Sequence, residues 1–290
     1  MTIRPRRSLL YMPGSNPRAL EKARALPADG LILDLEDAVA PDAKALAREQ
    51  IVAALAEGGY GHRELLVRIN ALSTPWGAED VRAIAAADTP PDAVLIPKVS
   101  TAEDVKDAIA AFESAGCPAS LDFWIMIETP LCILNIGEVT SAHPRLKGIV
   151  MGTSVLSKDT RVRHTPDRLG FITALNLSVY AARAHGLDVI DGVHLDLDDD
   201  AGLEASCAQG RDWGFDGKSL IHPKQIAAAN AAFAPDEAQL DQARAIIECW
   251  QQAQSEGKGV VVLNGRLVEN LHVEEAQRLL ELGEAIAAIS

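Results

Sequence analysis

Charged side chains recur in this sequence at the points where short apolar runs end. They are Glu36, Asp37, Arg68, Lys98 and Glu128. Carboxylates supply the hard oxygen ligands that a divalent cation, most often Mg2+, takes in proteins. A guanidinium suits a planar carboxylate, or a carbonyl that is becoming an enolate. If these side chains meet in one site, the pattern predicts metal-assisted chemistry on a small oxo-acid.

Each position also has a plain structural explanation, because strands often end in polar residues where they emerge into water. Glu128 illustrates both possibilities. It follows the apolar run 123–127, which is typical of a strand buried on both faces. It also precedes Thr129-Pro130, where its charge would suit the N-terminus of a helix. Recurrence of the pattern at other strand ends favours a functional site.

The elements that must position these residues alternate between short apolar runs and amphipathic helical stretches, eight times over. Strands are predicted at 8–12, 31–35, 65–70, 93–97, 123–127, 148–152, 188–193 and 215–221, with helices at 17–26, 43–56, 78–86, 102–114, 131–141, 166–185 and 202–213. This alternation predicts an α/β fold, a (β/α)8 TIM barrel. The carboxyl ends of its strands meet at one face, where active sites of such barrels lie.

The competing architecture is an open doubly wound sheet. No G-x-G-x-x-G motif follows the first predicted strand, where the turn reads Pro13-Gly14-Ser15. Gly217-Lys218-Ser219 resembles the end of a phosphate loop, but Asp212 stands where that loop needs its first glycine. Both observations favour the barrel.

Residues 1–230 are assigned to the barrel and residues 231–290 to a C-terminal appendage. The appendage is predicted to contain helices at 236–254 and 273–288. Between them Asn264-Gly265 is a strong signal for a β-hairpin turn. We expect this helical and hairpin segment to pack on the barrel of its own or of a neighbouring subunit.

Bulk properties exclude several classes of protein. The net charge of -14 argues against a nucleic-acid partner. No apolar run approaches the ~20 residues of a membrane-spanning helix. The cysteines at 117, 132, 207 and 249 show no paired spacing, which predicts reduced thiols in the cytoplasm and argues against a zinc site.

Six motifs occur in order along the predicted barrel. They are Arg7-Ser8-Leu9-Leu10-Tyr11-Met12-Pro13-Gly14, Leu33-Asp34-Leu35-Glu36-Asp37-Ala38-Val39, Val67-Arg68-Ile69-Asn70, Ile96-Pro97-Lys98, Ile127-Glu128-Thr129 and Ile221-His222-Pro223-Lys224-Gln225. With them the sequence resembles the citrate lyase β-subunit-like family of the HpcH/HpaI aldolase superfamily. That family includes malyl-CoA, citramalyl-CoA and citryl-CoA lyases and malyl-CoA thioesterases. Residues 265–276 resemble its C-terminal segment.

The resemblance implies a TIM barrel, commonly a homotrimer or hexamer, that binds Mg2+, a CoA thioester and a small oxo-acid. Glu128 would be a protein ligand of Mg2+. Arg68 would bind the oxo-acid carbonyl and stabilise the enolate oxygen. Asp37 and Glu36 would lie beside the metal and hold its waters.

Further site residues are implied by the same resemblance. A set around the substrate and the CoA phosphates comprises Arg7, Pro13, Gly14, Asn70, Lys98, Gly152 and Thr153. In the family a carboxylate of the C-terminal segment acts as acid or base in a neighbouring subunit's site. Glu269 takes that position here, and the alternative is a solvated residue of the hairpin.

One position departs from the family pattern. After the sixth strand the family usually has Gly-Thr-x-Asp-Leu, whose Asp is a second ligand of the metal, but this chain has Val155 there. An isopropyl group cannot coordinate Mg2+, which depends on carboxylate charge. Three explanations stand: water replaces the carboxylate in a weaker site, activity has been lost, or the chain carries an Asp-to-Val change. Asp159 lies four residues further on and would need a rebuilt loop to replace it.

The first functional prediction is a Mg2+-dependent lyase that cleaves a 3-hydroxy-acyl-CoA of the malyl-CoA, citramalyl-CoA or citryl-CoA type. Its products would be acetyl-CoA or another acyl-CoA and an oxo-acid. Arg68 would polarise the substrate, and Glu269 would protonate the CoA enolate. The first alternative is a malyl-CoA thioesterase that uses the same site. The second, favoured by Val155, is a catalytically impaired protein that binds CoA esters.

Overall fold

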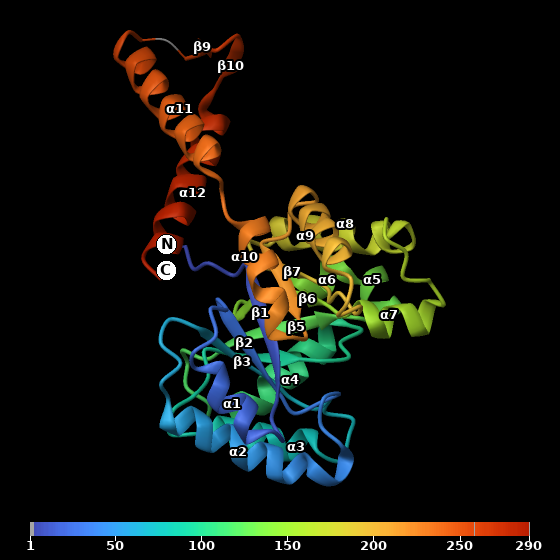
Figure 1. The fold of residues 1–290 in the computed structure, drawn as a ribbon. Helices are drawn as coiled ribbons and strands as arrows, with labels where there is room; N and C mark the ends of the chain where they lie inside the picture. Colours follow the sequence, from blue (N-terminus) through green and yellow to red (C-terminus); the bar gives the residue numbers. More distant parts are fainter. Residues whose placement is uncertain (1–2, 258, 290) are drawn as a thin grey trace. The chain divides into compact units, whose positions relative to one another are not determined.

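The computed structural model describes residues 3–257 and 259–289 (Figure 1). The chain forms two compact units. One is Arg6–Ala232, and the other contains the residues from Phe233 onward together with those before Arg6.

The first unit is a closed barrel of eight parallel strands, in which neighbours in the chain are neighbours in the sheet and β8 pairs with β1. The strands are β1 Ser8–Pro13, β2 Gly30–Asp34, β3 Glu64–Arg68, β4 Ala93–Ile96, β5 Asp122–Ile127, β6 Leu146–Met151, β7 Asp188–Asp191 and β8 Gly217–Leu220. Every predicted strand is present, and the predicted TIM barrel is confirmed.

Helices connect the strands and surround the barrel (Figure 1). The α-helices of this unit are α1 Pro17–Ala23, α2 Lys44–Glu57, α3 Gly77–Ala85, α4 Ala102–Ser114, α5 Pro130–Leu134, α6 Ile136–Thr140, α7 Thr153–Thr160, α8 Ile172–Ala184, α9 Asp200–Asp212 and α10 Ile226–Phe233, with short 3-10 turns at Pro41–Ala43, Leu169–Phe171 and Pro223–Gln225.

Three helical predictions need correction. The helix predicted at 131–141 is two helices, because the chain turns at Asn135. The helix predicted from 166 begins later, because Arg168 takes a left-handed conformation with φ 50°. The third, α7, was expected to be a loop. Its apolar side chains are Val155 and Leu156, next to each other, so the sequence lacks a helical repeat of apolar residues there.

The barrel interior is filled by large side chains that the strands direct inward. Its buried cluster is Leu9, Ile32, Leu66, Ala93, Leu95, Trp124, Met126, Val150 and Ile190. Trp124 of β5 is opposite Gly148 of β6 in the sheet register. A Cβ atom at Gly148 would lie 2.5 Å from the indole ring, so only glycine leaves room for Trp124 at this level of the barrel.

The second unit consists of α11 Glu237–Ser255, a hairpin of β9 Val261–Leu263 and β10 Arg266–Val268, and α12 Asn270–Ala287. The predicted turn is confirmed: Asn264 and Gly265 have φ of 50° and 77°, as a two-residue type I′ turn requires. A small core of Trp250, Val268 and Val273 holds the unit together.

Candidate active site

Arg68 and Asp34 form the centre of the charged cluster at the carboxyl ends of β2 and β3. The two residues are opposite each other in the sheet register. Arg68 donates from Nε to Asp34 Oδ1 at 2.7 Å and from Nη2 to Oδ2 at 2.5 Å. Asp34 also accepts the backbone N–H groups of Glu36 and Ala38. The guanidinium lies over the Tyr11 ring, 4.7 Å from its centroid. This bidentate pair holds Arg68 in one orientation.

Lys98 joins the remaining carboxylates. Its Nζ lies 3.2 Å from Glu36 Oε1, 3.3 Å from Asp37 Oδ2 and 3.4 Å from Glu128 Oε1. Its backbone N–H donates to Glu128 Oε1 at 2.8 Å. Lys98 has a left-handed backbone with φ 55°, which is uncommon for a residue with a side chain and is typical of functional sites.

Burial and the packing of like charges set the protonation of the cluster. The pKa of Glu36 is raised to about 7, chiefly by burial and also by the nearby Glu128 and Asp37, against the lowering effect of Arg68 and Lys98. Burial lowers the pKa of Arg68, but Asp34 offsets this and the net pKa is raised. The same holds for Lys98, whose pKa is raised by Glu128, Glu36 and Asp37 against the effect of burial. Both cations are therefore charged at neutral pH.

A cavity of about 300 Å³ adjoins this cluster. Its polar lining comes from Asp34, Asp37, Arg68, Glu128, Thr153 and Ser154, and its apolar lining includes Met126, Met151, Val155, Val193, Leu195 and Ile221. Glu128 is only 1% exposed, whereas the Asp37 side chain is 58% exposed. The cavity therefore has in its lining the Arg68 cation paired with Asp34, the buried carboxylate of Glu128 and the solvated carboxylate of Asp37.

Gly152 leaves the room that the buried Glu128 side chain occupies beside the cavity. A Cβ atom at Gly152 would lie 2.4 Å from Glu128 Cβ and 2.7 Å from Oε2. Helix α5 begins directly after Glu128, with Thr129 as its N-cap, as the sequence indicated. Because Glu128 also lines the cavity, a role in helix capping alone does not account for its place.

The family model for HpcH/HpaI aldolase/citrate lyase matches residues 7–223. The chain belongs to this family. It is 49% identical over 284 residues to a (3S)-malyl-CoA thioesterase of Cereibacter sphaeroides, covering 98% of this chain and 96% of the relative. It is 36% identical to an L-malyl-CoA/beta-methylmalyl-CoA lyase of the same species, covering 98% and 96%.

Among solved structures, the fold is similar to that of CitE from Mycobacterium tuberculosis in complex with magnesium, acetoacetate and coenzyme A. The TM-score is 0.78 at 27% sequence identity, and the match covers 98% of this chain and all of that one. The family resemblance seen in the sequence motifs is thereby confirmed.

The structure brings together five of the residues singled out for this family, Glu36, Asp37, Arg68, Lys98 and Glu128, with Gly152 and Thr153 beside them. Other predicted residues lie outside the cavity lining. Pro13 ends β1, and the Gly14 N–H donates to the Asp34 carbonyl. Asn70 is buried and donates to Asp80 and to the Leu35 carbonyl, so it supports the backbone after β2.

Arg7 is not at this face of the barrel, contrary to the placement expected for the family's substrate site. It precedes β1 and is buried against Asp29, which accepts from its Nε at 2.8 Å and from its Nη2 at 2.7 Å. The reason is positional: a residue before a strand lies at the amino end of the barrel, opposite the catalytic face.

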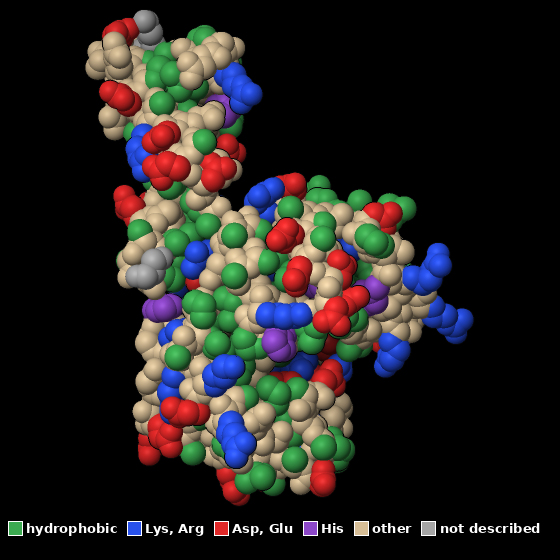
Figure 2. All heavy atoms as spheres, viewed as in Figure 1, with side chains coloured by type: hydrophobic (Ala, Val, Ile, Leu, Met, Phe, Trp, Pro, Cys, Tyr) green, Lys and Arg blue, Asp and Glu red, His purple; other side chains and the backbone are tan. Residues whose placement is uncertain are grey.

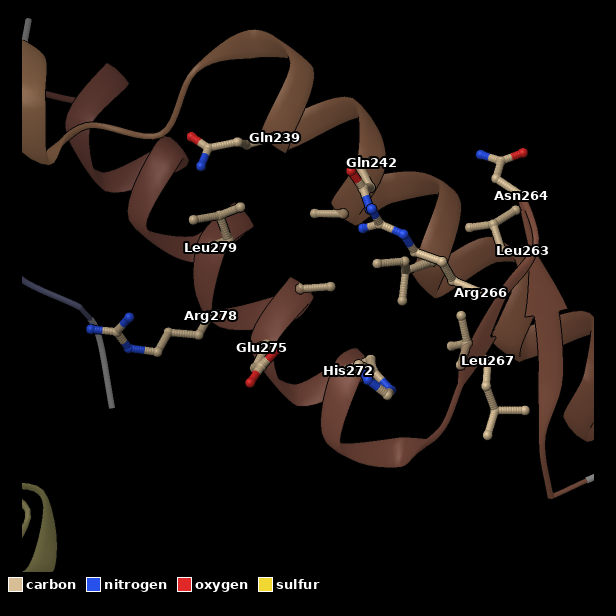
Figure 3. Close-up of a pocket in the computed structure, with 14 residues that line it drawn as sticks. Gln239, Gln242, Leu263, Asn264, Arg266, Leu267, His272, Glu275, Arg278 and Leu279 are labelled. Atoms are coloured by element: carbon tan, nitrogen blue, oxygen red, sulfur yellow. The ribbon is translucent and has the colours of Figure 1, made fainter. Parts of the chain in front are cut away.

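Glu269 belongs to the second unit, where it is the N-cap residue of α12 and its N–H donates to His272 Nδ1 at 3.0 Å. A cavity of about 790 Å³ lies beside it, lined by α11, the hairpin and α12 (Figure 3). Its polar lining is Gln239, Gln242, Asn264, Arg266, His272, Glu275 and Arg278, and Glu269 does not line it. This cavity lacks the clustered carboxylates of the barrel site.

The metal that the family resemblance implies can be tested against the donors present. In the described ranges 3–257 and 259–289, no group of three or more His, Cys, Asp and Glu side chains is arranged to hold a metal. Glu128 offers one buried carboxylate at the cavity, and Asp37 offers a solvated one. Mg2+ is commonly held by one or two carboxylates with waters and substrate oxygens. A cation here would have Glu128 as its single direct protein carboxylate, and Oε1 of that carboxylate already accepts the Lys98 N–H at 2.8 Å.

Val155 lies on α7, is half-buried and lines the cavity. Asp159 cannot take its place, because four residues of α-helix separate the two by about 6 Å along the axis. Asp159 pairs instead with Lys158, outside the cavity lining. Lys158, Arg161 and Arg163 are exposed, and Figure 2 shows basic side chains gathered at this end of α7.

Two parts of the site were missed from the sequence. Asp34 closes the second apolar strand beside Glu36 and Asp37, but no sequence pattern assigned it a role in the site. The second is a buried network in which Arg168 Nη1 donates to both oxygens of Asp191 at 2.7 Å, and Lys218 donates to Asp191 at 2.9 Å and to Ser206 at 2.9 Å. It ties the segment after α7 to β7 and β8, and residues so distant in sequence give no local signal.

Proposed function

We propose that this chain hydrolyses the thioester of a malyl-CoA-type substrate to the free acid and the CoA thiol. The observation that carries the proposal is the 49% identity to a malyl-CoA thioesterase over almost the full length of both chains. The sequence motifs alone ranked carbon–carbon cleavage first, and this similarity reverses that order.

The Arg68 guanidinium supports such a reaction because its position is fixed by Asp34 before substrate arrives. When water attacks the thioester carbonyl carbon, negative charge develops on the carbonyl oxygen. A pre-oriented cation in a small, largely apolar cavity stabilises that oxyanion without reorganising. Arg68 is thus assigned to the carbonyl oxygen of the substrate.

Asp37 is assigned as the base that takes the proton from the attacking water, because it is the solvated carboxylate that lines the cavity. The C–O bond forms as this proton moves to Asp37. The C–S bond then breaks, and the departing thiolate receives the same proton. Lys98 and Glu36 orient Asp37 through the Lys98 ammonium, which lies 3.2 to 3.3 Å from both carboxylates.

Glu128 is the residue that would hold Mg2+ directly, with Asp37 and Glu36 reaching it through waters. A divalent cation in such a place supplies Lewis-acid polarisation of a substrate oxygen and neutralises the acid's carboxylate. CitE from M. tuberculosis was solved with magnesium, which supports this assignment for the present family member.

Carbon–carbon cleavage is the second candidate, favoured by the 36% identity to a malyl-CoA lyase. In that reaction Arg68 would stabilise the enolate oxygen of the CoA product. Glu269 of another copy would supply the proton to its carbon, as an oligomer of the predicted kind would allow. Hydrolysis forms no enolate, so it does not require Glu269 to protonate a carbon atom.

The test is to incubate the protein with malyl-CoA and Mg2+ and to follow free thiol and glyoxylate in parallel. Hydrolysis releases malate and CoA thiol without glyoxylate. Cleavage releases glyoxylate and acetyl-CoA without free thiol. If neither product forms, while malyl-CoA still binds, the chain is the impaired CoA-ester-binding protein and both catalytic proposals fail.

A further inference from the structure

Tyr11 brings a polar atom to the deep end of the barrel cavity. Its ring packs against the buried cluster of the barrel interior, and the Arg68 guanidinium lies 4.7 Å from the ring centroid. In the sheet register Tyr11 is aligned with Ile32, whereas Asp34 is aligned with Pro13 and with Arg68. Tyr11 therefore starts about 6–7 Å deeper along the strands than the charged pair. The substrate group that enters furthest is the one that meets it.

The Tyr11 hydroxyl has only a weak acceptor in its observed hydrogen bond. It donates to Met126 Sδ at 3.4 Å, and a thioether sulfur is a poor acceptor compared with oxygen. Both residues line the cavity, so a substrate oxygen can replace the sulfur as the acceptor. Burial raises the pKa of the hydroxyl above its ordinary range, against the lowering effect of Arg68. The group is therefore a proton donor at neutral pH.

The size of the cavity selects the part of the substrate that reaches Tyr11. CoA is too large for about 300 Å³, so the acyl chain is the part that enters. With its thioester carbonyl at Arg68, a malyl group directs its hydroxyl and its free carboxylate deeper. Asp34 and Glu128 both act electrostatically on Tyr11, and their charges disfavour a further anion there. The neutral hydroxyl of the substrate is the better match.

We propose that Tyr11 is a specificity-determining residue whose hydroxyl donates a hydrogen bond to the hydroxyl oxygen of a 3-hydroxy-acyl group. This inference rests on the proposed function, in that the acyl group is malyl-like. An acyl group without the hydroxyl leaves Tyr11 with its thioether acceptor and gains no hydrogen bond from it. The chain should therefore prefer malyl-CoA over succinyl-CoA, which lacks this hydroxyl and is otherwise the same.

The test compares thiol release from malyl-CoA and from succinyl-CoA. For the unmodified chain we expect kcat/KM to be at least about tenfold higher for malyl-CoA. Tyr11→Phe removes the hydroxyl and keeps the ring against Arg68, so it should lower this ratio about tenfold, through malyl-CoA alone. Tyr60→Phe is the matched control and should leave the ratio unchanged. Its hydroxyl is also buried, but it lies outside the cavity lining and donates to the Leu20 carbonyl at 3.2 Å.

A ratio near one in the unmodified chain would overturn the proposal, whether or not a variant folds. An unchanged ratio in Tyr11→Phe would also overturn it. So would an equal loss on both esters, because that result would assign the hydroxyl to the support of Arg68.

Calorimetric titration with (S)-malate and with succinate gives a second measurement that needs no turnover. Tyr11→Phe should weaken the binding of malate about tenfold and leave that of succinate unchanged. If these affinities behave as expected but malyl-CoA releases no thiol, only the proposed function fails. If thiol is released but neither preference depends on Tyr11, only the inference fails.

Discussion

Asp34 and Arg68 face each other across neighbouring strands and form two parallel hydrogen bonds of 2.7 and 2.5 Å. Arg68→Lys keeps the charge but cannot form this fork. We expect kcat/KM for malyl-CoA to fall about 10²-fold, because the cation loses its fixed position opposite the developing oxyanion. Steady-state kinetics test this. An unchanged kcat/KM would show that charge alone, without orientation, is sufficient.

Glu36 should make stability depend on pH. Its pKa is about 7 in the folded protein against an ordinary value of 4.5, so between these values the folded state holds a proton that the unfolded state releases. The free energy of unfolding therefore falls as pH rises from 4.5 to 7 and is flat above that window. The expected contribution is on the order of 2 kcal/mol.

Glu36→Gln removes this dependence. Relative to the unmodified chain, the variant should gain stability from pH 5 to pH 8, as measured by denaturant unfolding in the presence of a chelator. The comparison uses the slope against pH, since any change in packing caused by the substitution affects both ends of the range equally. Parallel pH profiles for the two proteins would contradict the raised pKa.

Glu269→Ser separates the two candidate reactions. Serine keeps a good N-cap for α12 but has no carboxylate. Thiol release from malyl-CoA should be unchanged, whereas any glyoxylate release should fall by about 10² or more, because only cleavage needs a proton on carbon. Glu269→Asp, which retains the carboxylate, is the control. An equal loss of both products would assign Glu269 a role in holding the assembly rather than in proton transfer.

Gly152→Ala tests the packing beneath Glu128. The added methyl group would meet Glu128 Cβ at 2.4 Å, so we expect a loss of about 1–3 kcal/mol in unfolding free energy and weaker cation binding. Gly137→Ala in α6 is the matched control, since no atom lies within 4 Å of its Cβ position. It should be neutral or stabilising by up to about 1 kcal/mol. Equal behaviour of the two variants would show that Glu128 moves aside freely.

The grouping of Arg68, Lys98 and Glu128 could be predicted from the sequence. A closed parallel barrel brings the carboxyl ends of all its strands to one face, and each of these residues follows or ends a strand. The same rule, applied strictly, places Arg7 at the opposite end. Helix α7 escaped detection because its apolar residues Val155 and Leu156 are adjacent and form no repeat. The hydrogen bonds between Arg168, Asp191 and Lys218 join residues that are far apart in the sequence. Local sequence patterns cannot predict such a pairing.

That buried pairing has a kinetic consequence. Arg168 binds both oxygens of a fully buried Asp191, and breaking a buried ion pair typically costs about 3–5 kcal/mol. An open state of the segment after α7 would then be populated well below about 1%. We therefore expect this part of the rim to act as a rigid wall, and substrate to enter at the side where the Asp37 side chain is exposed.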